Sequence, residues 1–328
     1  MDTVKLIAGR SNKPLAHGIV KALGKSLVNC TIDSFANGEI RVEINENVRG
    51  CHVFIIQTGG TDNENSINDY LVETLLIVDA CKRADAHKVA VVLACFPYAR
   101  SDKRDKRGVP IGASMAMNLL KAAGANRIIS MDLHSGQLQG FTKLPCDNLY
   151  GIKLHIDNLL NGLFKGLTFE EINSKYVLVS LDVGGAKRCK EYARRLHMCC
   201  GIMDKQRDNS KPNTVLKSAL IGDVKDKIAI CIDDMVDTCG TVLSGIADLQ
   251  EHGARSAIIL ATHGVLSGPA AKRINECDFI KQVIVVDTLD QTKNMQIIPK
   301  LQVIESYPLF AEVIKRIICG GSVSALFE

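Results

Sequence analysis

The chain has 328 residues, of which 46% are hydrophobic and 23% are charged, and its formal net charge is +4. This length exceeds one typical hydrophobic core and fits two domains, while the mild charge excess argues against a nucleic-acid binder. No apolar run approaches the roughly 18 residues of a membrane-spanning helix. No basic segment followed by an apolar stretch marks a signal peptide. The twelve scattered cysteines include no Cys-x-x-Cys pair, so we expect reduced thiols in a cytoplasmic protein.

Strand-like and helix-like segments alternate along the chain, which predicts an α/β fold with parallel sheets. The predicted strands are residues 1–8, 53–57, 89–93, 127–131, 177–181, 228–232, 257–261 and 283–286. The predicted helices are residues 14–23, 67–83, 112–123, 186–196, 241–252 and 309–318. Three of these helices are expected to stop at Gly24, Gly124 and Gly253. Residues 59–68 and 165–174 are predicted to be surface loops.

A short internal repeat indicates two similar halves. A Gly-Ala pair at position 124 is followed by a predicted strand and His134, and a Gly-Ala pair at position 253 is followed at the same spacing by a predicted strand and His263. The two copies are about one domain length apart, which favours a duplicated α/β domain. We therefore predict an N-terminal domain over residues 1–152 and a C-terminal domain over residues 153–328.

The first motif in chain order is Phe35-Ala-Asn-Gly-Glu39. Taken alone, it is a turn between two strands. Its aromatic face, amide and carboxylate could also stack on a purine and form hydrogen bonds with it.

The second motif is a cationic run. Five cations and two carboxylates fill residues 100–107, directly after Cys95-Phe-Pro-Tyr-Ala99 and the predicted strand 89–93. Such a run is usually a solvated face or a nucleic-acid patch. Because it follows the carboxyl end of a strand, a triphosphate ligand would also explain why several cations lie in one loop.

Two further strand ends carry polar residues. His134 follows strand 127–131, within reach of a phosphate or a metal there, although a lone histidine is more often structural. Asp182 follows strand 177–181, and a Gly184-Gly185 turn then enters a helix, which is where open α/β sheets place ligands. Asp182 could hold a metal ion or a ribose hydroxyl, or it could simply cap the helix.

Lys205-Gln206-Arg207 lies in a polar segment that reaches Pro212. By itself it is an ordinary charged loop. It gains interest as a mobile pair of cations that could close over a reacting phosphate.

The most informative stretch runs from residue 228 to 241. An apolar run is followed by Asp233, Asp234 and Asp237, and then Thr238-Cys-Gly-Thr opens a predicted helix. Backbone N–H groups at a helix N-terminus bind phosphate, and Gly240 allows close approach of the backbone. Carboxylates accept hydrogen bonds from sugar hydroxyls. These features predict a ribose 5-phosphate site, with an acidic helix cap or a divalent-ion loop as alternatives.

Together these stretches resemble the ribose-phosphate diphosphokinases, also called phosphoribosyl diphosphate synthetases. The Phe-Pro-Tyr-Ala-Arg and Met-Asp-Leu-His stretches are more particular to this family than the Asp-Asp-x-x-Asp-Thr loop, which phosphoribosyltransferases share. The resemblance covers nearly the whole chain, through residues 35–39, 47–50, 95–100, 131–134, 147–150, 184–188, 222–226, 233–241, 262–264, 267–269 and 322–324.

The resemblance implies two similar parallel-sheet domains of phosphoribosyltransferase type, related by duplication. The domain over residues 1–152 would carry the ATP and regulatory side. The domain over residues 153–328 would carry the ribose 5-phosphate site, with its last helix packing back on the N-terminal domain.

The resemblance also implies a reaction in which the anomeric hydroxyl of ribose 5-phosphate attacks the β-phosphorus of ATP and AMP leaves. The implied ATP contacts are Phe35, Asn37, Glu39, Arg100, Ser101, Asp102, Lys103, Arg104, Asp105 and His134. The implied ribose 5-phosphate contacts are Asp182, Asp233, Asp234, Asp237, Thr238, Cys239, Gly240 and Thr241. The implied Mg²⁺ ligands are Asp132, His134 and Asp182. The implied catalytic residues are Lys205, Arg207 and His134.

The resemblance also has implications for regulation and assembly. The resemblance assigns Arg49, Ser322 and Ser324 to a regulatory phosphate site, but Asn47 and Gly108 replace a serine and an arginine of that site. Activation by phosphate and inhibition by ADP therefore stay open. The family implies a homo-oligomer, a hexamer built from dimers, in which the adenine-binding turn serves a neighbouring subunit.

Two other functions compete with this prediction. A phosphoribosyltransferase would share the stretch 233–241 but would need neither an adenine-binding turn nor the cationic run. A non-catalytic, synthetase-associated regulatory subunit would carry a long insertion in the segment that begins at Lys205, whereas this segment is short and keeps both cations.

Overall fold

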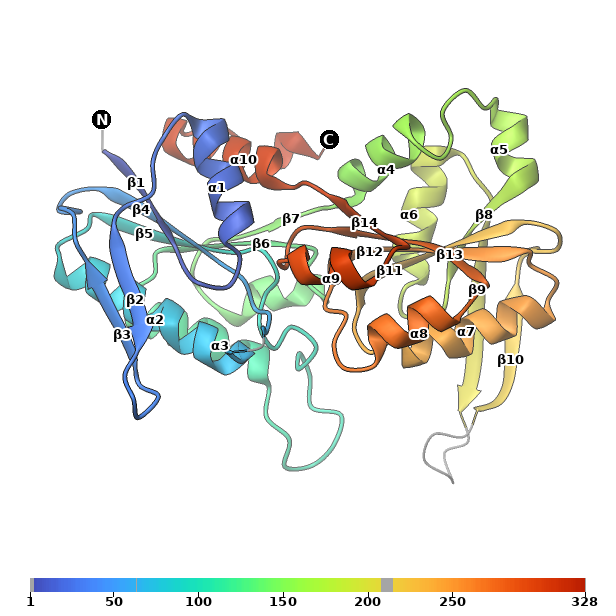
Figure 1. Cartoon of the computed structure of the whole chain (residues 1–328), viewed down its shortest axis with the longest axis horizontal. Coiled ribbons are helices and arrows are strands. Elements are labelled where there is room, and N and C mark those ends of the chain that lie inside the picture. Colours follow the sequence, from blue (N-terminus) through green and yellow to red (C-terminus); the bar gives the residue numbers. More distant parts are fainter. Residues whose placement is uncertain (1–2, 63, 208–214, 328) are drawn as a thin grey trace. The chain divides into compact units, whose positions relative to one another are not determined.

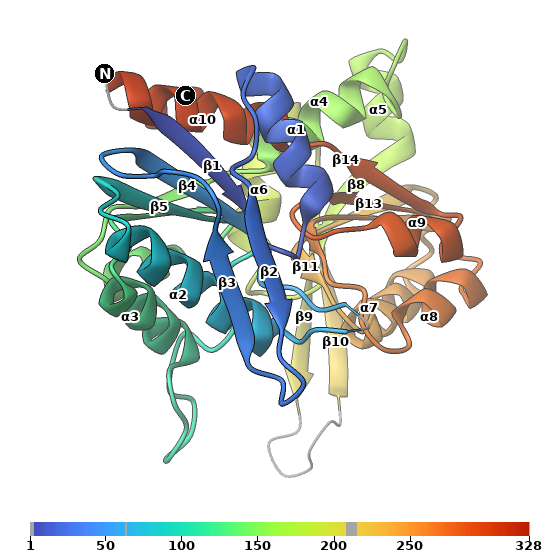
Figure 2. The same cartoon turned by 60° about the vertical axis from the view of Figure 1, so that its left-hand side comes forward.

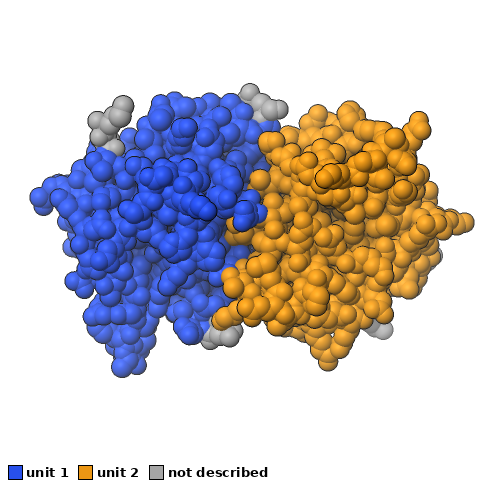
Figure 3. All heavy atoms as spheres, turned by 45° about the horizontal axis from the view of Figure 1, so that its top comes forward, with its two compact units in different colours: residues 1–150, 288–290, 305–328 blue, residues 151–287, 291–304 orange. Residues whose placement is uncertain are grey.

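The computed structural model describes residues 3–62, 64–207 and 215–327, and the side chains of residues 205–218 lie outside the description. No helix among the described residues is long and apolar enough to cross a membrane. The chain divides into two compact units, coloured separately in Figure 3. Unit 1 comprises residues 1–150, 288–290 and 305–328, and unit 2 comprises residues 151–287 and 291–304.

Unit 1 contains a five-stranded parallel sheet with the order β1-β4-β5-β6-β7. Its strands are β1 (Val4–Ala8), β4 (His52–Gln57), β5 (Lys88–Leu93), β6 (Arg127–Met131) and β7 (Cys146–Leu149). A separate antiparallel hairpin pairs β2 (Cys30–Ser34) with β3 (Ile40–Ile44).

Helices cover both faces of the unit 1 sheet, because its central strands are buried apolar runs. The helices are α1 (Lys13–Leu23), α2 (Ile67–Arg83), α3 (Gly112–Ala123), the 3₁₀ turn η1 (Gly136–Phe141), α10 (Tyr307–Cys319) and the 3₁₀ turn η2 (Ser324–Leu326). Figure 1 shows α1 and α10 side by side on one face and α2 and α3 on the other.

Unit 2 contains a seven-stranded sheet with the order β10-β9-β8-β11-β12-β13-β14. Only β10 is antiparallel to its neighbour. The strands are β8 (Tyr176–Ser180), β9 (Cys200–Arg207), β10 (Val215–Ile221), β11 (Ile228–Val236), β12 (Ser256–Gly264), β13 (Ile280–Val286) and β14 (Leu301–Ile304).

Alternate residues of the unit 2 strands feed two hydrophobic layers. Along β11, Ile230 and Ile232 pack with α4, α5 and α6, whereas Ala229 and Cys231 pack with α7 and α8. The helices are α4 (Ile152–Asn161), α5 (Phe169–Lys175), α6 (Ala186–Leu196), α7 (Gly240–Glu251), α8 (Ala270–Glu276) and α9 (Thr292–Ile297).

The two units repeat one topology. Both contain a run of five adjacent parallel strands in chain order, β1-β4-β5-β6-β7 in unit 1 and β8-β11-β12-β13-β14 in unit 2. Each also inserts a hairpin after the first strand and its helix. The hairpin β2–β3 stands as its own sheet in unit 1, whereas β9 and β10 extend the main sheet in unit 2 (Figure 2). The predicted fold class, two similar parallel-sheet α/β halves, is confirmed.

Two sequence-based boundaries are wrong. Residues 165–174 were expected to form a loop, but α5 begins within them, because Thr168 and Glu171 form a reciprocal capping box. The Glu171 carboxylate accepts from the Thr168 N–H at 2.7 Å, and the Thr168 hydroxyl accepts from the Glu171 N–H at 3.3 Å. Strand β11 also runs on to Val236 rather than stopping before Asp233, because it keeps pairing with β12.

The predicted glycine stops hold. Gly24 and Gly124 cap α1 and α3 in the left-handed conformation, with φ of 62° and 107°, and Gly253 follows α7 with φ of 83°. These stops turn each helix back toward the next strand.

Candidate active site

The acidic pair at the end of β11 shares one cation. The Asp234 side chain is 7% exposed and the Asp233 side chain is 39% exposed. Arg188 of α6 reaches both, with Nη1 at 3.0 Å from Asp234 Oδ1 and 3.8 Å from Asp233 Oδ1. The Asp234 N–H also donates to Asp233 Oδ1 at 2.8 Å. The buried carboxylate is thus paired with a cation, and the neighbouring Asp233 is the more exposed of the two.

The two carboxyl groups influence each other's protonation. Burial raises the pKa of Asp233 to about 7, and the adjacent Asp234 carboxyl adds to this rise, while Arg188 opposes it. Near neutral pH, Asp233 therefore passes between a hydroxyl donor and a charged acceptor.

The turn that follows is held in an unusual backbone conformation. Cys239 adopts a left-handed φ of 61° at the N-cap of α7, and its side chain is only 3% exposed. A non-glycine residue persists in this conformation only when its surroundings enforce it. Here Arg273 Nη1 donates to the Thr238 carbonyl at 2.7 Å, and the Ser267 hydroxyl donates to the Asp237 carboxylate.

This turn presents backbone amides to solvent. Thr238, Gly240 and Thr241 are exposed at the start of α7, and no side chain caps that end of the helix. Its first N–H groups are therefore available to an anion. Because the Cys239 side chain is buried, it can contribute only through its backbone.

A second loop of unit 2 lies between β8 and α6. Asp182 is exposed, and its Oδ1 accepts from the Gly185 N–H at 2.8 Å, so the helix-cap alternative is realised in part. The Ser180 hydroxyl donates to the Asp182 carbonyl at 2.7 Å. A Cβ added to Gly185 would lie 2.5 Å from Ser180 Oγ, so this position needs glycine.

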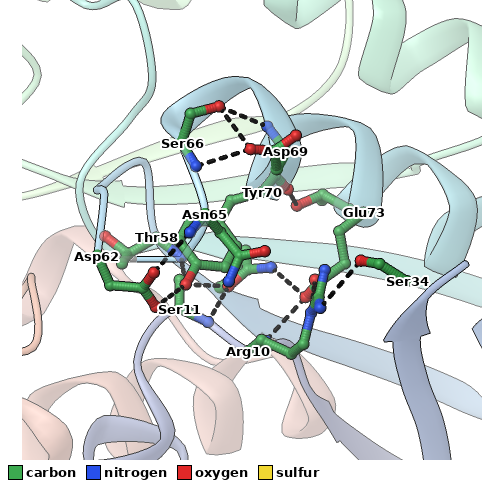
Figure 4. Close-up of polar contacts among 12 residues, drawn as sticks. Arg10, Ser11, Ser34, Thr58, Asp62, Asn65, Ser66, Asp69, Tyr70 and Glu73 are labelled. Carbon is green, nitrogen blue, oxygen red and sulfur yellow. Dashed lines mark hydrogen bonds and ion pairs between the residues drawn. The ribbon is translucent and has the colours of Figure 1, made fainter. Parts of the chain in front are cut away.

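The corresponding loop of unit 1, between β1 and α1, is filled by the protein itself. Glu73 is fully buried and accepts from the Arg10 N–H at 2.8 Å, from Arg10 Nε at 2.5 Å and from Gln57 Nε2 at 2.8 Å (Figure 4). Gln57 Oε1 accepts from the Ser11 N–H at 3.0 Å. Of the two equivalent loops, the one in unit 2 is therefore the more open to a ligand.

The cationic run of unit 1 lies between β5 and α3. Residues 103–108 are exposed, and Arg100 is exposed beside the base of the loop. Asp102 and Ser101 are half-buried, and Ser101 Oγ accepts from the Gly112 N–H at 2.9 Å. One acceptor position of the Ser101 hydroxyl is therefore used within the loop.

A third polar turn follows β6. Asp132 has a left-handed φ of 39°, and its N–H donates to the Leu149 carbonyl at 2.8 Å. The Leu133 N–H donates to Asn148 Oδ1 at 2.9 Å, and His134 is exposed at the end of the turn. In the part of the chain that the structure describes, no three His, Cys, Asp or Glu side chains gather as a metal-binding group.

The predicted adenine-binding turn is the tip of the hairpin β2–β3. Phe35 is 52% exposed, and the Arg41 guanidinium carbon lies 5.8 Å from its ring centroid. Asn37 Oδ1 accepts from the Glu39 N–H at 3.1 Å, and Gly38 has a φ of 90°. The turn is therefore formed as predicted, with an aromatic face open to solvent.

Lys205 and Arg207 lie on strand β9, where they pair in register with Ser218 and Val215 of β10. Their side chains fall outside the described ones. The short segment that follows them, residues 208–214, lies outside the described residues.

The three residues assigned to regulation are exposed and have local partners. Arg49 Nε lies 3.7 Å from Asp85 Oδ2. Arg316 Nη1 donates to the Ser322 carbonyl at 2.7 Å, and the Ser322 hydroxyl accepts from the Ala325 N–H at 3.3 Å. Ser324 begins η2.

Each unit has two groups of predicted residues at the carboxyl ends of neighbouring strands. In unit 1 the cationic run and the turn 132–134 follow the neighbouring strands β5 and β6. In unit 2 Asp182 follows β8, and the stretch 233–241 spans the end of the neighbouring strand β11 and the turn after it. Sequence reasoning missed the contacts of Arg188 and Arg273, because no local pattern indicates which distant loop a helix residue will touch.

Comparisons with known proteins agree on one family. Residues 4–124 match the N-terminal domain of ribose phosphate pyrophosphokinase, and residues 205–328 match the phosphoribosyl synthetase-associated domain. Ribose-phosphate pyrophosphokinase 2 of Schizosaccharomyces pombe is 40% identical over 334 aligned positions, which cover 100% of this chain and 98% of that protein. The phosphoribosylpyrophosphate synthetase of Mycobacterium smegmatis superposes with a TM-score of 0.87 at 36% identity, over 98% of this chain and 100% of that one.

Proposed function

Since the chain belongs to the ribose-phosphate pyrophosphokinase family, we propose that it transfers the diphosphoryl group of ATP to the anomeric hydroxyl of ribose 5-phosphate. The products are phosphoribosyl diphosphate and AMP. The observation that carries the proposal is the stretch 233–241. Its acidic pair lies near the end of β11, and the turn that follows has uncapped backbone amides.

The ribose 5-phosphate end of the reaction fits this turn. Asp233, the more exposed member of the acidic pair, can accept a hydrogen bond from a ribose hydroxyl when it is ionised, beside the paired Asp234. The exposed amides at Gly240 and Thr241 suit the 5-phosphate, because a helix N-terminus favours negative charge. Asp237 is held by Ser267 and keeps the turn in shape, and Asp182 adds an exposed carboxylate on the neighbouring loop.

The ATP end of the reaction fits unit 1. We propose that Arg100 and residues 101–105 hold the triphosphate, because several anionic oxygens need several cations in one loop. The exposed Phe35 ring suits stacking on adenine, with Asn37 and Glu39 as hydrogen-bonding groups on the same tip.

Phosphoryl transfer requires positioning and charge neutralisation more than covalent catalysis. We propose that Lys205 and Arg207 neutralise the transferring phosphates and that His134, exposed at its strand end, binds a phosphate or metal there.

We propose Mg²⁺ as the cofactor, with Asp132 and His134 of unit 1 and Asp182 of unit 2 as its candidate ligands. This ion takes few protein ligands and completes its shell with phosphate oxygens and water. When bound, it would neutralise charge on the transferring phosphates. On the protein side, Asp182 has one oxygen committed to Gly185, which fixes the carboxylate on its loop.

We also propose a cytoplasmic homo-oligomer, built from dimers and expected to be a hexamer. The free state of all twelve cysteines supports a reducing compartment. An adenine-binding turn that projects its aromatic ring into solvent supports donation of this turn to a neighbouring subunit.

A direct assay tests the function. Purified protein is incubated with ATP, ribose 5-phosphate and Mg²⁺, and AMP and phosphoribosyl diphosphate are followed by chromatography with and without inorganic phosphate. We expect equal amounts of both products. No product from folded, oligomeric protein would contradict the proposal and favour a non-catalytic associated subunit.

The role of Lys205 predicts a specific kinetic change. We expect Lys205→Ala to lower kcat by about 10²–10³-fold, because the lost cation acts on the transition state rather than on bound substrate. Steady-state kinetics with both substrates provides the measurement, and Lys217→Ala on the paired strand β10 is the control. A raised KM with unchanged kcat would show that Lys205 serves binding only.

A further inference from the structure

The segment between β4 and α2 is held by several hydrogen bonds to the Asp62 side chain. Asp62 Oδ1 accepts from the Glu64 and Asn65 N–H groups at 2.8 and 2.7 Å, and Tyr70 donates its hydroxyl to the Asp62 carboxylate. Ser66 and Asp69 form a capping box at the start of α2, as Figure 4 shows. These contacts fix the first turn of α2 in unit 1.

Asn68 lies in that first turn, and its side chain bonds a residue outside α2. The Tyr98 hydroxyl donates a hydrogen bond to Asn68 Oδ1. Tyr98 lies two residues before Arg100, at the base of the cationic run, and has a left-handed φ of 58°. A bulky residue keeps this conformation only when tertiary contacts hold it, and the bond from α2 is one such contact.

The Tyr98 ring also lies at the far end of the run. A Cβ added to Gly112, the first residue of α3, would lie 3.1 Å from Tyr98 Cδ1 and 3.2 Å from Ser101 Cβ. The Ser101 N–H donates to the Tyr98 carbonyl at 2.9 Å, and the Ala113 N–H donates to the Ser101 carbonyl at 3.2 Å. The two ends of the run therefore meet around Tyr98.

The start of the segment before Asn68 contacts the residues that precede Tyr98. The Gly59 N–H donates to the Cys95 carbonyl at 2.8 Å, and a Cβ on Gly59 would lie 2.6 Å from the Pro97 backbone nitrogen. The close approach leaves no room for a side chain at Gly59. The segment 59–68 thus contacts the base of the cationic run at two places, through Gly59 and through Asn68.

From this closed arrangement we infer that Tyr98 and Asn68 are positioning residues that fix the base of the cationic loop 102–111, so that its exposed cations meet the triphosphate in one geometry. The inference rests on the proposed ATP role of that loop. It assigns a role to the segment 59–68: it carries the anchor for the loop.

Kinetics tests the inference with Tyr98→Phe and Asn68→Ala. Each removes one partner of the hydrogen bond and leaves the ring or the helix in place. We expect the KM for ATP to rise about three- to tenfold, while the KM for ribose 5-phosphate stays within about twofold. The double variant is expected to be no worse than the more affected single variant, because both remove one bond. Asn68→Asp keeps an acceptor oxygen and is expected to restore the wild-type KM.

Limited trypsin digestion provides a readout that does not depend on catalysis. Cleavage after Lys103, Arg104, Lys106 and Arg107 reports directly on the freedom of the loop. We expect faster cleavage in both variants and no change in the matched controls Tyr150→Phe and Asn118→Ala, which alter exposed residues of unit 1.

The outcomes separate the two proposals. If the wild-type protein forms no phosphoribosyl diphosphate, the proposed function fails, and the cleavage rates still decide whether Tyr98 and Asn68 hold the loop. Unchanged cleavage in both variants, or additive effects in the double variant, would overturn the positioning role.

Discussion

At the scale of single residues, several unusual backbone conformations lie at or beside the candidate sites. Among the described residues, seven non-glycine positions have a positive φ. Tyr98, Asp132, Cys239 and Leu266 are four of them, and each follows the carboxyl end of a parallel strand. Neighbouring groups hold them, as Asn68 holds Tyr98 and as Arg273 holds the turn around Cys239. Such conformations are stable only where the surrounding structure enforces them, and they gather at functional sites.

The acidic pair predicts a pH dependence. Because the pKa of Asp233 is raised to about 7, this carboxyl is mostly protonated in the free protein at lower pH. We expect kcat/KM for ribose 5-phosphate to rise about tenfold per pH unit below 7 and to level off above it. Asp233→Asn should lower the plateau and remove this part of the profile, while the titration of the substrate phosphate remains.

Ionisation of Asp233 is expected to raise kcat/KM but to lower the stability of the fold. The folded pKa lies above the ordinary value of 3.8, so ionisation of Asp233 destabilises the fold as pH rises from about 4 to about 7. Asp233→Asn should therefore gain thermal stability relative to the wild type across this window, as measured by calorimetry. The exposed Asp278→Asn serves as the control, and an equal response in both variants would contradict the assignment.

At the scale of elements, strong periodicity predicts helices well and short exposed helices poorly. The helices at residues 67–83, 112–123 and 186–196 occur with the predicted bounds. The helix α5 was predicted as a loop, although its Thr-x-x-Glu start is visible in the sequence. Only Ile172 of its seven residues is buried, so the helix lacks the apolar periodicity on which the prediction relied.

The capping box of α5 gives a stability prediction. Thr168→Ala removes the hydroxyl that accepts from the Glu171 N–H, and we expect a loss of about 1 kcal/mol in the free energy of unfolding. For a unit of this size the melting temperature should fall by about 2–4 °C. Thr168→Ser keeps the hydroxyl and should restore the wild-type value. No change in Thr168→Ala would show that α5 forms without its cap.

At the scale of the whole molecule, a duplicated topology serves two different purposes. The loop after the first strand is closed in unit 1 by Glu73 and Gln57, and it is open in unit 2 around Asp182. The candidate ligand-binding residues lie at the third and fourth strands of the repeat in unit 1 and at the first and second strands in unit 2. One topology therefore carries an exposed loop rich in cations in one unit and an exposed turn with an uncapped helix N-terminus in the other.

The cysteines provide a prediction for the whole chain. Ten of the twelve are buried or half-buried, and Cys199 and Cys319 are exposed. Burial also raises the pKa of Cys30 and Cys146 to about 11, which keeps them as unreactive thiols. We expect a thiol reagent to label two cysteines rapidly in the native protein and all twelve after denaturation. The control is a Cys199→Ser, Cys319→Ser variant, in which rapid labelling should be absent. Rapid labelling of further cysteines in the wild type would contradict their burial.

The sequence by itself determined the fold class, the positions of the central strands of both sheets and the stretches that are proposed to carry chemistry. Hydrophobic periodicity, glycine stops and the acidic run before Thr238 are local signals, and parallel strands bring their carboxyl ends to one edge. Only the tertiary structure decided how far β11 extends, that Arg188 pairs with Asp234, and that Tyr98 is tied to Asn68. These contacts join residues far apart in the chain, and their geometry depends on how helices and loops pack on the sheet, which no local pattern encodes.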